Sequence, residues 1–99
     1  INASYIDKAL KKVKNKQGNL YDKAALMLYE LTQIHAFESG NKRTAFLTTK
    51  KFVIKNEGKF NIPDSTDNVK VMIGIRENYY SLNEIKEWIK NGEIKEFRR

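Results

Sequence analysis

The sequence has no cysteine and only one proline, one tryptophan and one histidine among its 99 residues. Without cysteine the chain can form no disulfide framework and no cysteine–zinc site. It also has no apolar run that approaches the ~20 residues of a membrane-spanning helix, and no signal peptide is visible. These absences fit a reducing compartment, so we expect a cytoplasmic protein that does not act at a membrane.

The length and composition indicate one small domain. A chain of this size with 40% hydrophobic residues can bury a modest core, roughly 60–70% of its unfolded surface. We therefore expect residues 1–99 to form a single domain. The first residue is Ile1 rather than methionine, and we expect the chain to be a fragment or a processed form.

The net charge of +7 leaves two interpretations open. A basic chain can bind nucleic acid, or its lysines can simply solvate helix surfaces. Many lysines occur at helix-surface spacing, as Lys8, Lys11 and Lys12 do, which favours the second interpretation. A nucleotide substrate or an acidic partner would also suit a basic surface.

Apolar residues recur at three- and four-residue spacing in five segments, which is the period of amphipathic helices. The helices that this spacing predicts run from about Ser4 to Lys14, Leu20 to Ile34, Asn41 to Asn56, about Ser65 to Arg76 and Leu82 to Asn91. Ser81 and Glu84 form a capping box before the last helix, while Gly58 and Gly92 are placed to end the third and the last. The segment from Lys59 to Ile62 is the only strand candidate, so the class is all-α.

Three further expectations concern the packing of these helices. Extra leucines widen the apolar stripe of the second helix, so this helix should be central and largely buried. The third helix is expected at the centre of the bundle, with a polar loop exposed at its N-terminus. Trp88 is expected in the core, and the charged residues 93–99 are expected to fray.

The polar stretch between the second and third helices reads HAFESGNKRTA, residues 35–45. The first N–H groups of a helix have no intrahelical partner, and the helix dipole adds partial positive charge there. Lys42 and Arg43 place two more cations at this unfavourable end, which indicates that the helix start holds an anion. Gly40 lets a ligand approach the main chain, and Arg43 can bind two phosphate oxygens at once. His35 titrates near neutrality and can act as a base.

The pattern H-x-F-x-x-G-N-K-R-T-A resembles the signature of the Fic/Doc (Fido) superfamily. Lysine at position 42 and Phe46 at a position where Fic members have a second arginine look like the Doc, or "death on curing", branch. Residues 20–25 and 81–90 are also similar to Doc helices. The resemblance implies a small Fido-type helical bundle around a central helix that the motif loop precedes. It also implies that the chain lacks a helix and a substrate-aligning flap, which in the family come before the part resembling Tyr5 onward.

The resemblance further implies a Doc-like toxin that transfers a phosphoryl group, or AMP, from a nucleoside triphosphate to a hydroxyl side chain of a target protein. His35 would be the catalytic base, and Gly40, Asn41, Lys42 and Arg43 would bind the phosphates. Mg²⁺ with ATP or another nucleoside triphosphate would be the cofactor. The implied partners are a target protein such as a translation factor, and an antitoxin protein.

The sequence departs from the family at the metal position. The usual motif has an acid four residues after the histidine, where this chain has Ser39 and places Glu38 one residue early. A hydroxyl can ligate Mg²⁺ but brings no charge, so Ser39 is a weak ligand and Glu38 is the alternative. Two other functions therefore stay open: a Fido-fold binding module with little catalytic activity, and a basic helical nucleic-acid-binding domain.

Overall fold

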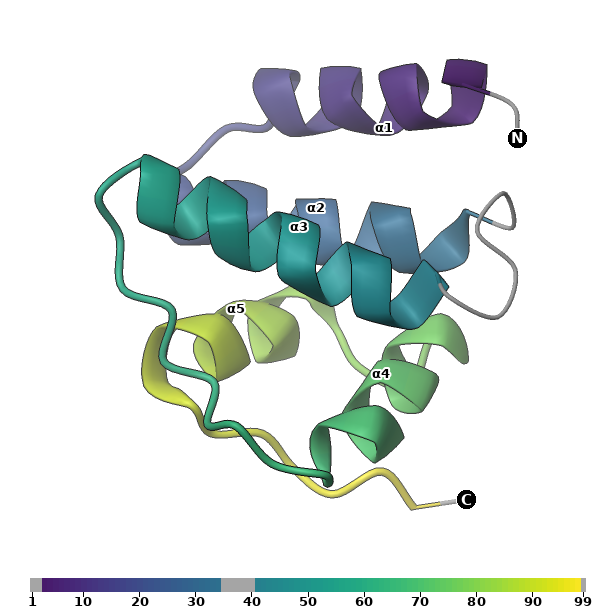
Figure 1. Cartoon of the computed structure of the whole chain (residues 1–99), viewed down its shortest axis with the longest axis vertical. Helices are drawn as coiled ribbons and strands as arrows, with labels where there is room; N and C mark the ends of the chain where they lie inside the picture. The colour runs from purple at the N-terminus through teal and green to yellow at the C-terminus, as the bar shows by residue number, and fades with distance from the viewer. Residues whose placement is uncertain (1–2, 35–40, 99) are drawn as a thin grey trace.

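The computed structural model describes residues 3–34 and 41–98, and in this part of the chain every regular element is an α-helix (Figure 1). The elements are α1 (Ala3–Asn15), α2 (Leu20–Gln33), α3 (Asn41–Lys55), α4 (Asn68–Arg76) and α5 (Leu82–Asn91). The expected all-α class is confirmed. None of the described helices is long and apolar enough to cross a membrane.

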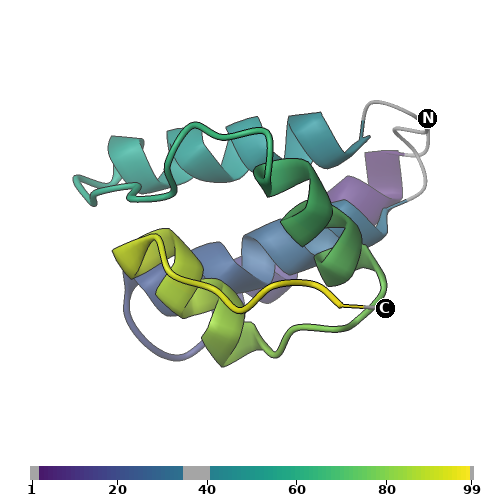
Figure 2. The same ribbon diagram turned by 90° about the horizontal axis from the view of Figure 1, so that it is seen from below.

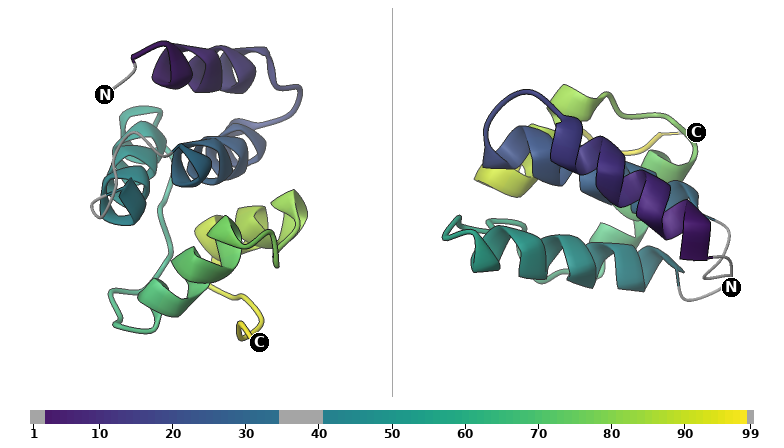
Figure 3. Two further views of the ribbon diagram at one scale, coloured as in Figure 1. Left: turned by 90° about the vertical axis from the view of Figure 1, so that its right-hand side faces the viewer. Right: turned by 90° about the horizontal axis from the view of Figure 1, so that it is seen from above.

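The helix at the centre of the bundle is α2, against which each of the other four helices packs. Figure 3 shows α1 and α3 on two sides of α2, with α4 and α5 beyond it. The expectation of a buried, central second helix is thus confirmed, whereas α3 packs chiefly on α2 and is not itself the centre. The reason is that α2 is apolar over a wide arc, with Ala24, Ala25 and Leu28 almost fully buried.

The core is aliphatic apart from a few aromatic and threonine side chains. Its largest members with almost no exposed surface come from α2, α3, α4 and α5: Leu28, Val53, Ile75, Ile85 and Ile89. Trp88 is 2% exposed and lies in this core, as expected. The buried hydroxyls are satisfied within their own helices, because Thr32 donates to the Leu28 carbonyl at 2.6 Å and Thr49 to the Ala45 carbonyl at 2.8 Å.

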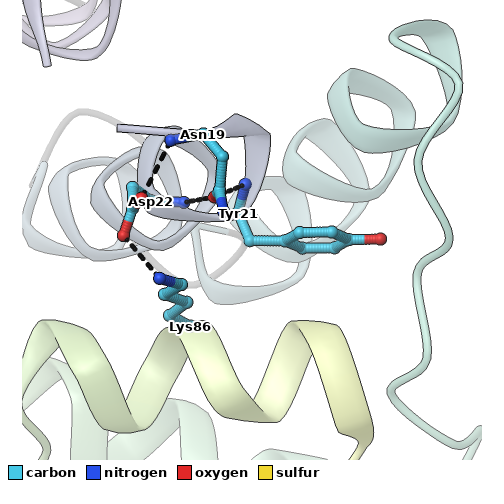
Figure 4. A network of polar contacts seen from close by, with 4 residues as sticks. All are labelled: Asn19, Tyr21, Asp22 and Lys86. Carbon is cyan, nitrogen blue, oxygen red and sulfur yellow. Dashed lines mark hydrogen bonds and ion pairs between the residues drawn. The ribbon is translucent and has the colours of Figure 1, made fainter. Parts of the chain in front are cut away.

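A network of polar contacts holds the N-terminal end of α2 (Figure 4). The Asn19 side chain accepts hydrogen bonds from the backbone N–H groups of Tyr21 and Asp22, and the Asp22 carboxylate accepts one from the Asn19 N–H at 2.9 Å. This capping box also reaches α5, because Lys86 Nζ lies 3.0 Å from Asp22 Oδ1. The Lys86 ammonium and the Asn19 N–H hold the pKa of Asp22 below its ordinary value.

Helix ends follow the sequence signals at α5 and depart from them at α3. Ser81 and Glu84 form the expected capping box, and Gly92 closes α5 with a left-handed φ of 74°. After α3, however, the left-handed residue is Glu57, with φ of 65°. Its neighbour Gly58 donates back to the Val53 carbonyl at 2.9 Å, as the residue after the left-handed position does in a Schellman motif. Glycine suits position 58 because an added Cβ would meet a Leu20 methyl and would lie 3.0 Å from Val53 Cγ1.

The fourth helix begins later than predicted. The backbone of residues 66 and 67 forms a turn, and Ser65 Oγ accepts from the Asp67 N–H at 3.1 Å. Ser65 therefore stabilises this turn and does not cap α4, which starts at Asn68 with no side-chain cap. Two apolar residues of α4, Val69 and Ile73, are 61% and 37% exposed.

The segment after α5 is packed, which corrects the expectation of a frayed C-terminus for residues 93–98. It runs back along α5 and α4 (Figure 2), with Ile94 and Phe97 half-buried. Tyr80 donates its phenolic hydrogen to the Lys95 carbonyl at 2.9 Å. Burial raises the pKa of Tyr80 to about 12, so this phenol remains a donor at neutral pH. The segment is anchored by packing that its charged composition does not indicate.

Candidate functional site

The motif lies between two helices that pack closely on each other. The C-terminal end of α2 and the N-terminal end of α3 lie at the same end of the molecule (Figure 1). The sequence-predicted residues His35, Phe37, Glu38, Ser39 and Gly40 fall outside the described residues. The described structure therefore defines the two helix ends that bracket the motif.

Helix α3 begins at Asn41, where the sequence predicts it. For Asn41 and Lys42 the backbone alone is described, and it is helical. The first turn contains no acidic residue, and the Arg43 side chain is exposed. Thr44 is exposed as well. The start of α3 thus combines backbone N–H groups that have no partner within the helix, the positive end of the dipole and an exposed guanidinium, and a helix start of this kind can bind an anion.

Apolar side chains one turn further along fix this end of α3 to the core. Ala45 has no exposed surface. The ring of Phe46 contacts Phe60 edge-on, with 5.3 Å between the centroids, and lies 6.1 Å from Trp88. The side chain at position 46 is therefore a half-buried packing residue.

The end of α2 that leads into the motif is held by hydrogen bonds that the sequence does not signal. Gln33 Nε2 donates to the carbonyls of Ile75 and Arg76 at 3.0 and 3.2 Å, at the last turn of α4. One helical turn before Gln33, the Tyr29 hydroxyl donates a hydrogen bond to Asn78 Oδ1, just after the end of α4. These partners are more than 40 positions apart in the chain, so no local pattern could have identified them. They fix the direction in which the chain leaves α2 toward His35.

A hollow of about 560 Å³ adjoins Arg43 between α3 and α4. Its apolar wall consists of Phe46, Leu47, Val69 and Met72, and its polar wall includes Asp64, Ser65 and Asn68. Leu47 and Val69 are 46% and 61% exposed. Val69 is exposed because it lies on the wall of this hollow.

The described residues contain no group of three or more histidine, cysteine, aspartate or glutamate side chains that could hold a metal ion. The groups that do carry a lowered pKa, Asp22 and Glu84, are capping residues of α2 and α5. They are structural and lie at neither end of the motif.

Residues 3–53 match the sequence profile described as the Fic/DOC family. These are 51 of the 99 residues, and they include α1, α2, the motif and most of α3. The chain therefore belongs to the Fic/DOC family, whose members are generally transferases of AMP or phosphoryl groups. No curated protein and no solved structure matches the chain.

Proposed function

We propose that the chain is a Doc-type toxin that transfers a phosphoryl group from a nucleoside triphosphate to a hydroxyl side chain of a target protein. The observation that supports this most is the start of α3 at Asn41, within the motif, with Arg43 exposed in a first turn that has no acid. This helix start lies inside the region that matches the Fic/DOC family.

In the proposed reaction His35 accepts the proton of a serine, threonine or tyrosine hydroxyl of the target. The hydroxyl oxygen forms a bond to the terminal phosphorus as the bond to the leaving nucleoside diphosphate breaks. Negative charge on the phosphate oxygens is stabilised by the backbone N–H groups at Gly40 and Asn41 and by the cations of Lys42 and Arg43. Because the helix holds the backbone N–H groups at the start of α3, these donors need little rearrangement when the charge develops.

The proposed cofactor is Mg²⁺ bound together with ATP or another nucleoside triphosphate. The protein donors at the metal position are the uncharged hydroxyl of Ser39 or, as the alternative, the carboxylate of Glu38. Mg²⁺ prefers charged oxygens and releases its waters reluctantly. Such a donor set suits an ion that enters with the triphosphate, where it would supply positive charge to the phosphate oxygens.

Two residues favour phosphoryl transfer over AMP transfer. Position 42 is lysine, as in the Doc branch. Position 46, where Fic members have a second arginine, is a phenylalanine that packs against Phe60 and Trp88. The proposed partners, which follow from the Doc resemblance, are a translation factor as the target and an antitoxin that neutralises the activity.

The test is transfer of radiolabel from ATP to protein in a translation extract. ATP labelled at the γ-phosphate should label a target, whereas ATP labelled at the α-phosphate should not. The variant His35→Ala should lower the transfer rate by about 10²–10⁴-fold, with an unchanged helical circular dichroism spectrum. Transfer that survives this substitution removes His35 from the reaction. Label from the α-position would favour AMP transfer, and ATP binding without any transfer would favour a binding module.

A further inference from the structure

A group of lysines lies at the end of the bundle opposite the start of α3. The end of α1, the start of α2 and the end of α3 meet there, at the left-hand side of Figure 1. Contacts between these segments show the meeting directly. The Tyr21 hydroxyl accepts from the Lys59 N–H and donates to the Lys59 carbonyl, each at 2.9 Å, and one hollow is lined by Lys14, Lys23 and Asn56. The cations of this lysine-rich end are Lys14, Lys16, Lys23, Lys55 and Lys59.

The positive charge of the lysine-rich end is not compensated within the chain. None of its five lysines has an ion-pair partner among the described residues. The neighbouring acids of α2 are bound elsewhere, because Asp22 Oδ1 lies 3.0 Å from Lys86 Nζ. Likewise, Glu30 Oε1 lies 3.1 Å from Lys12 Nζ. Glu57, just after α3, adds one negative charge, so this end still carries much of the net charge of +7.

Helix stability accounts for only part of this arrangement. Lys14 and Lys55 lie in the last turns of α1 and α3, where a cation offsets the negative end of the helix dipole. Lys16 and Lys59 lie outside the helices. Lys23 lies in the first turn of α2, at the positive end of that dipole. The dipole therefore does not explain three of the five cations, which favours an anion from outside the chain.

We propose that the lysine-rich end binds double-stranded RNA through the phosphates of its backbone. Lysines that neutralise phosphates release the counterions condensed on the duplex, and this release favours binding. The five cations come from three helix ends and the loops beside them, so they are spread over a surface and are not aligned on one helix. A duplex presents its charges on two strands and can meet such a spread.

Two other anionic partners fit this end less well. Single-stranded nucleic acid stacks its bases on aromatic rings, but Tyr21, Phe52 and Phe60 are half-buried against the core. A membrane surface binds a face from which apolar side chains insert between the lipids. The loops at this end, residues 16–19 and 56–59, consist of polar residues and glycine. Both comparisons favour a ligand that is bound by charge and hydrogen bonds alone.

RNA is favoured over DNA by the way in which each duplex is recognised. Sequence readers of DNA place a helix or a β-ribbon in the major groove, whereas these cations lie at helix ends and in loops. An RNA duplex is bound by its shape, its phosphates and its 2′-hydroxyls. The exposed amides of Asn15 and Gln17, on either side of Lys16, can bond such hydroxyls. With a rise of 1.5 Å per residue, the lysine-rich end is about 20 Å along α3 from Arg43, and the inference does not rest on the proposed transferase function.

The first experiment measures binding of the full chain to an RNA duplex of about 16 base pairs by fluorescence anisotropy. The comparison ligands are a DNA duplex and a single-stranded RNA of the same sequence. The RNA duplex should bind with a dissociation constant of about 1–100 µM near physiological salt, and the affinity should fall steeply as salt rises. In the chain labelled with ¹⁵N, the RNA duplex should shift amide resonances of residues 14–23 and 55–59 and leave those of α4 unchanged.

The second experiment separates local charge from net charge. The double variant Lys23→Gln, Lys59→Gln removes two cations that no helix dipole needs. It should weaken binding of the RNA duplex by about tenfold and make the salt slope less steep by about 2. The matched control Lys8→Gln, Lys70→Gln makes the same change of net charge at exposed lysines outside this end, and it should change the affinity by less than about threefold. Circular dichroism and the melting temperature check that each variant keeps its fold.

The proposal is overturned if the RNA duplex does not bind, if its resonance shifts fall on another surface, or if the two double variants weaken binding equally. Equal or tighter binding of the DNA duplex or of the single strand would assign the lysine-rich end to that ligand instead. Tighter binding to vesicles that contain anionic phosphatidylserine would assign it to a membrane. Binding of polyglutamate as tight as that of RNA would assign it to an acidic protein.

Discussion

Replacing Arg43 by glutamine should stabilise the fold while weakening the proposed nucleotide site. Arg43 is exposed in the first turn of α3, where no acidic residue offsets its charge. A cation at the positive end of a helix dipole is unfavourable by about 0.3–1 kcal/mol at low ionic strength. In a chain of this size about 1 kcal/mol corresponds to roughly 4–8 °C in the melting temperature, so Arg43→Gln should raise it by a few degrees.

The same substitution should reduce the affinity for ATP. A hydrogen bond from a charged donor to phosphate contributes about 1.5–3 kcal/mol, which corresponds to roughly 10- to 150-fold in the dissociation constant. Calorimetric titration with a non-hydrolysable ATP analogue and Mg²⁺ measures this loss. A higher melting temperature together with a lower ATP affinity would indicate that Arg43 serves nucleotide binding at the expense of fold stability.

The matched control is Lys51→Gln, which removes one exposed cation from the middle of α3. Because position 51 is far from the first turn, neither the melting temperature nor the ATP affinity should change beyond the small effect of net charge. The prediction is wrong if Arg43→Gln lowers the melting temperature. It is also wrong if Arg43→Gln and Lys51→Gln bind the ATP analogue with the same affinity.

Three more expectations follow from the sequence and the described contacts. Ser39→Asp should tighten Mg²⁺ binding without nucleotide, because it adds a charged oxygen. If calorimetry finds that Ser39→Asp leaves the Mg²⁺ affinity unchanged and Glu38→Ala abolishes it, the metal ligand is Glu38. Glu57→Gly should stabilise the fold by about 0.5–1 kcal/mol, since φ at this position is 65° and a side chain there is strained; a lowered midpoint in urea would contradict this. The lowered pKa values of Asp22 and Glu84 contribute stability that is present above their unfolded pKa values and is lost as the pH falls through their folded values. Urea midpoints should therefore be constant near neutrality and decline below about pH 4, and Asp22→Asn should lower the midpoint at pH 7 more than at pH 3.

Helices and caps were predictable because their causes are local. The apolar spacing of α2 and the pairing of Ser81 with Glu84 act over three or four residues, and each produced the helix or cap expected of it. The start of α3 at Asn41 was predictable for the same reason, because it depends on neighbouring residues. The motif itself depends only on residue order, so the family was also accessible from the sequence.

The end of α3 was predicted wrongly by one residue, because local sequence signals do not report contacts between distant segments. Glycine at 58 indicated the stop of α3, yet the left-handed conformation falls one residue earlier, and at 58 the small residue leaves room for Leu20 of α2. Similarly, the charged residues after Gly92 indicated a frayed end, whereas the hydrogen bond from Tyr80 and the packing of Ile94 and Phe97 against the core hold that segment in place. In both cases a distant contact determined the conformation.

The sequence by itself determined the helical class, the position of the motif at a helix start and the positive charge of the surface. Only the tertiary structure decided that α2 is the central helix, that Gln33 donates hydrogen bonds to the last turn of α4, and that Tyr80 holds the segment after α5. The physical reason is that helix formation and capping are set by neighbours within one turn. Burial and long-range hydrogen bonds instead depend on which helix surfaces meet, and this is a property of the whole set of helices together.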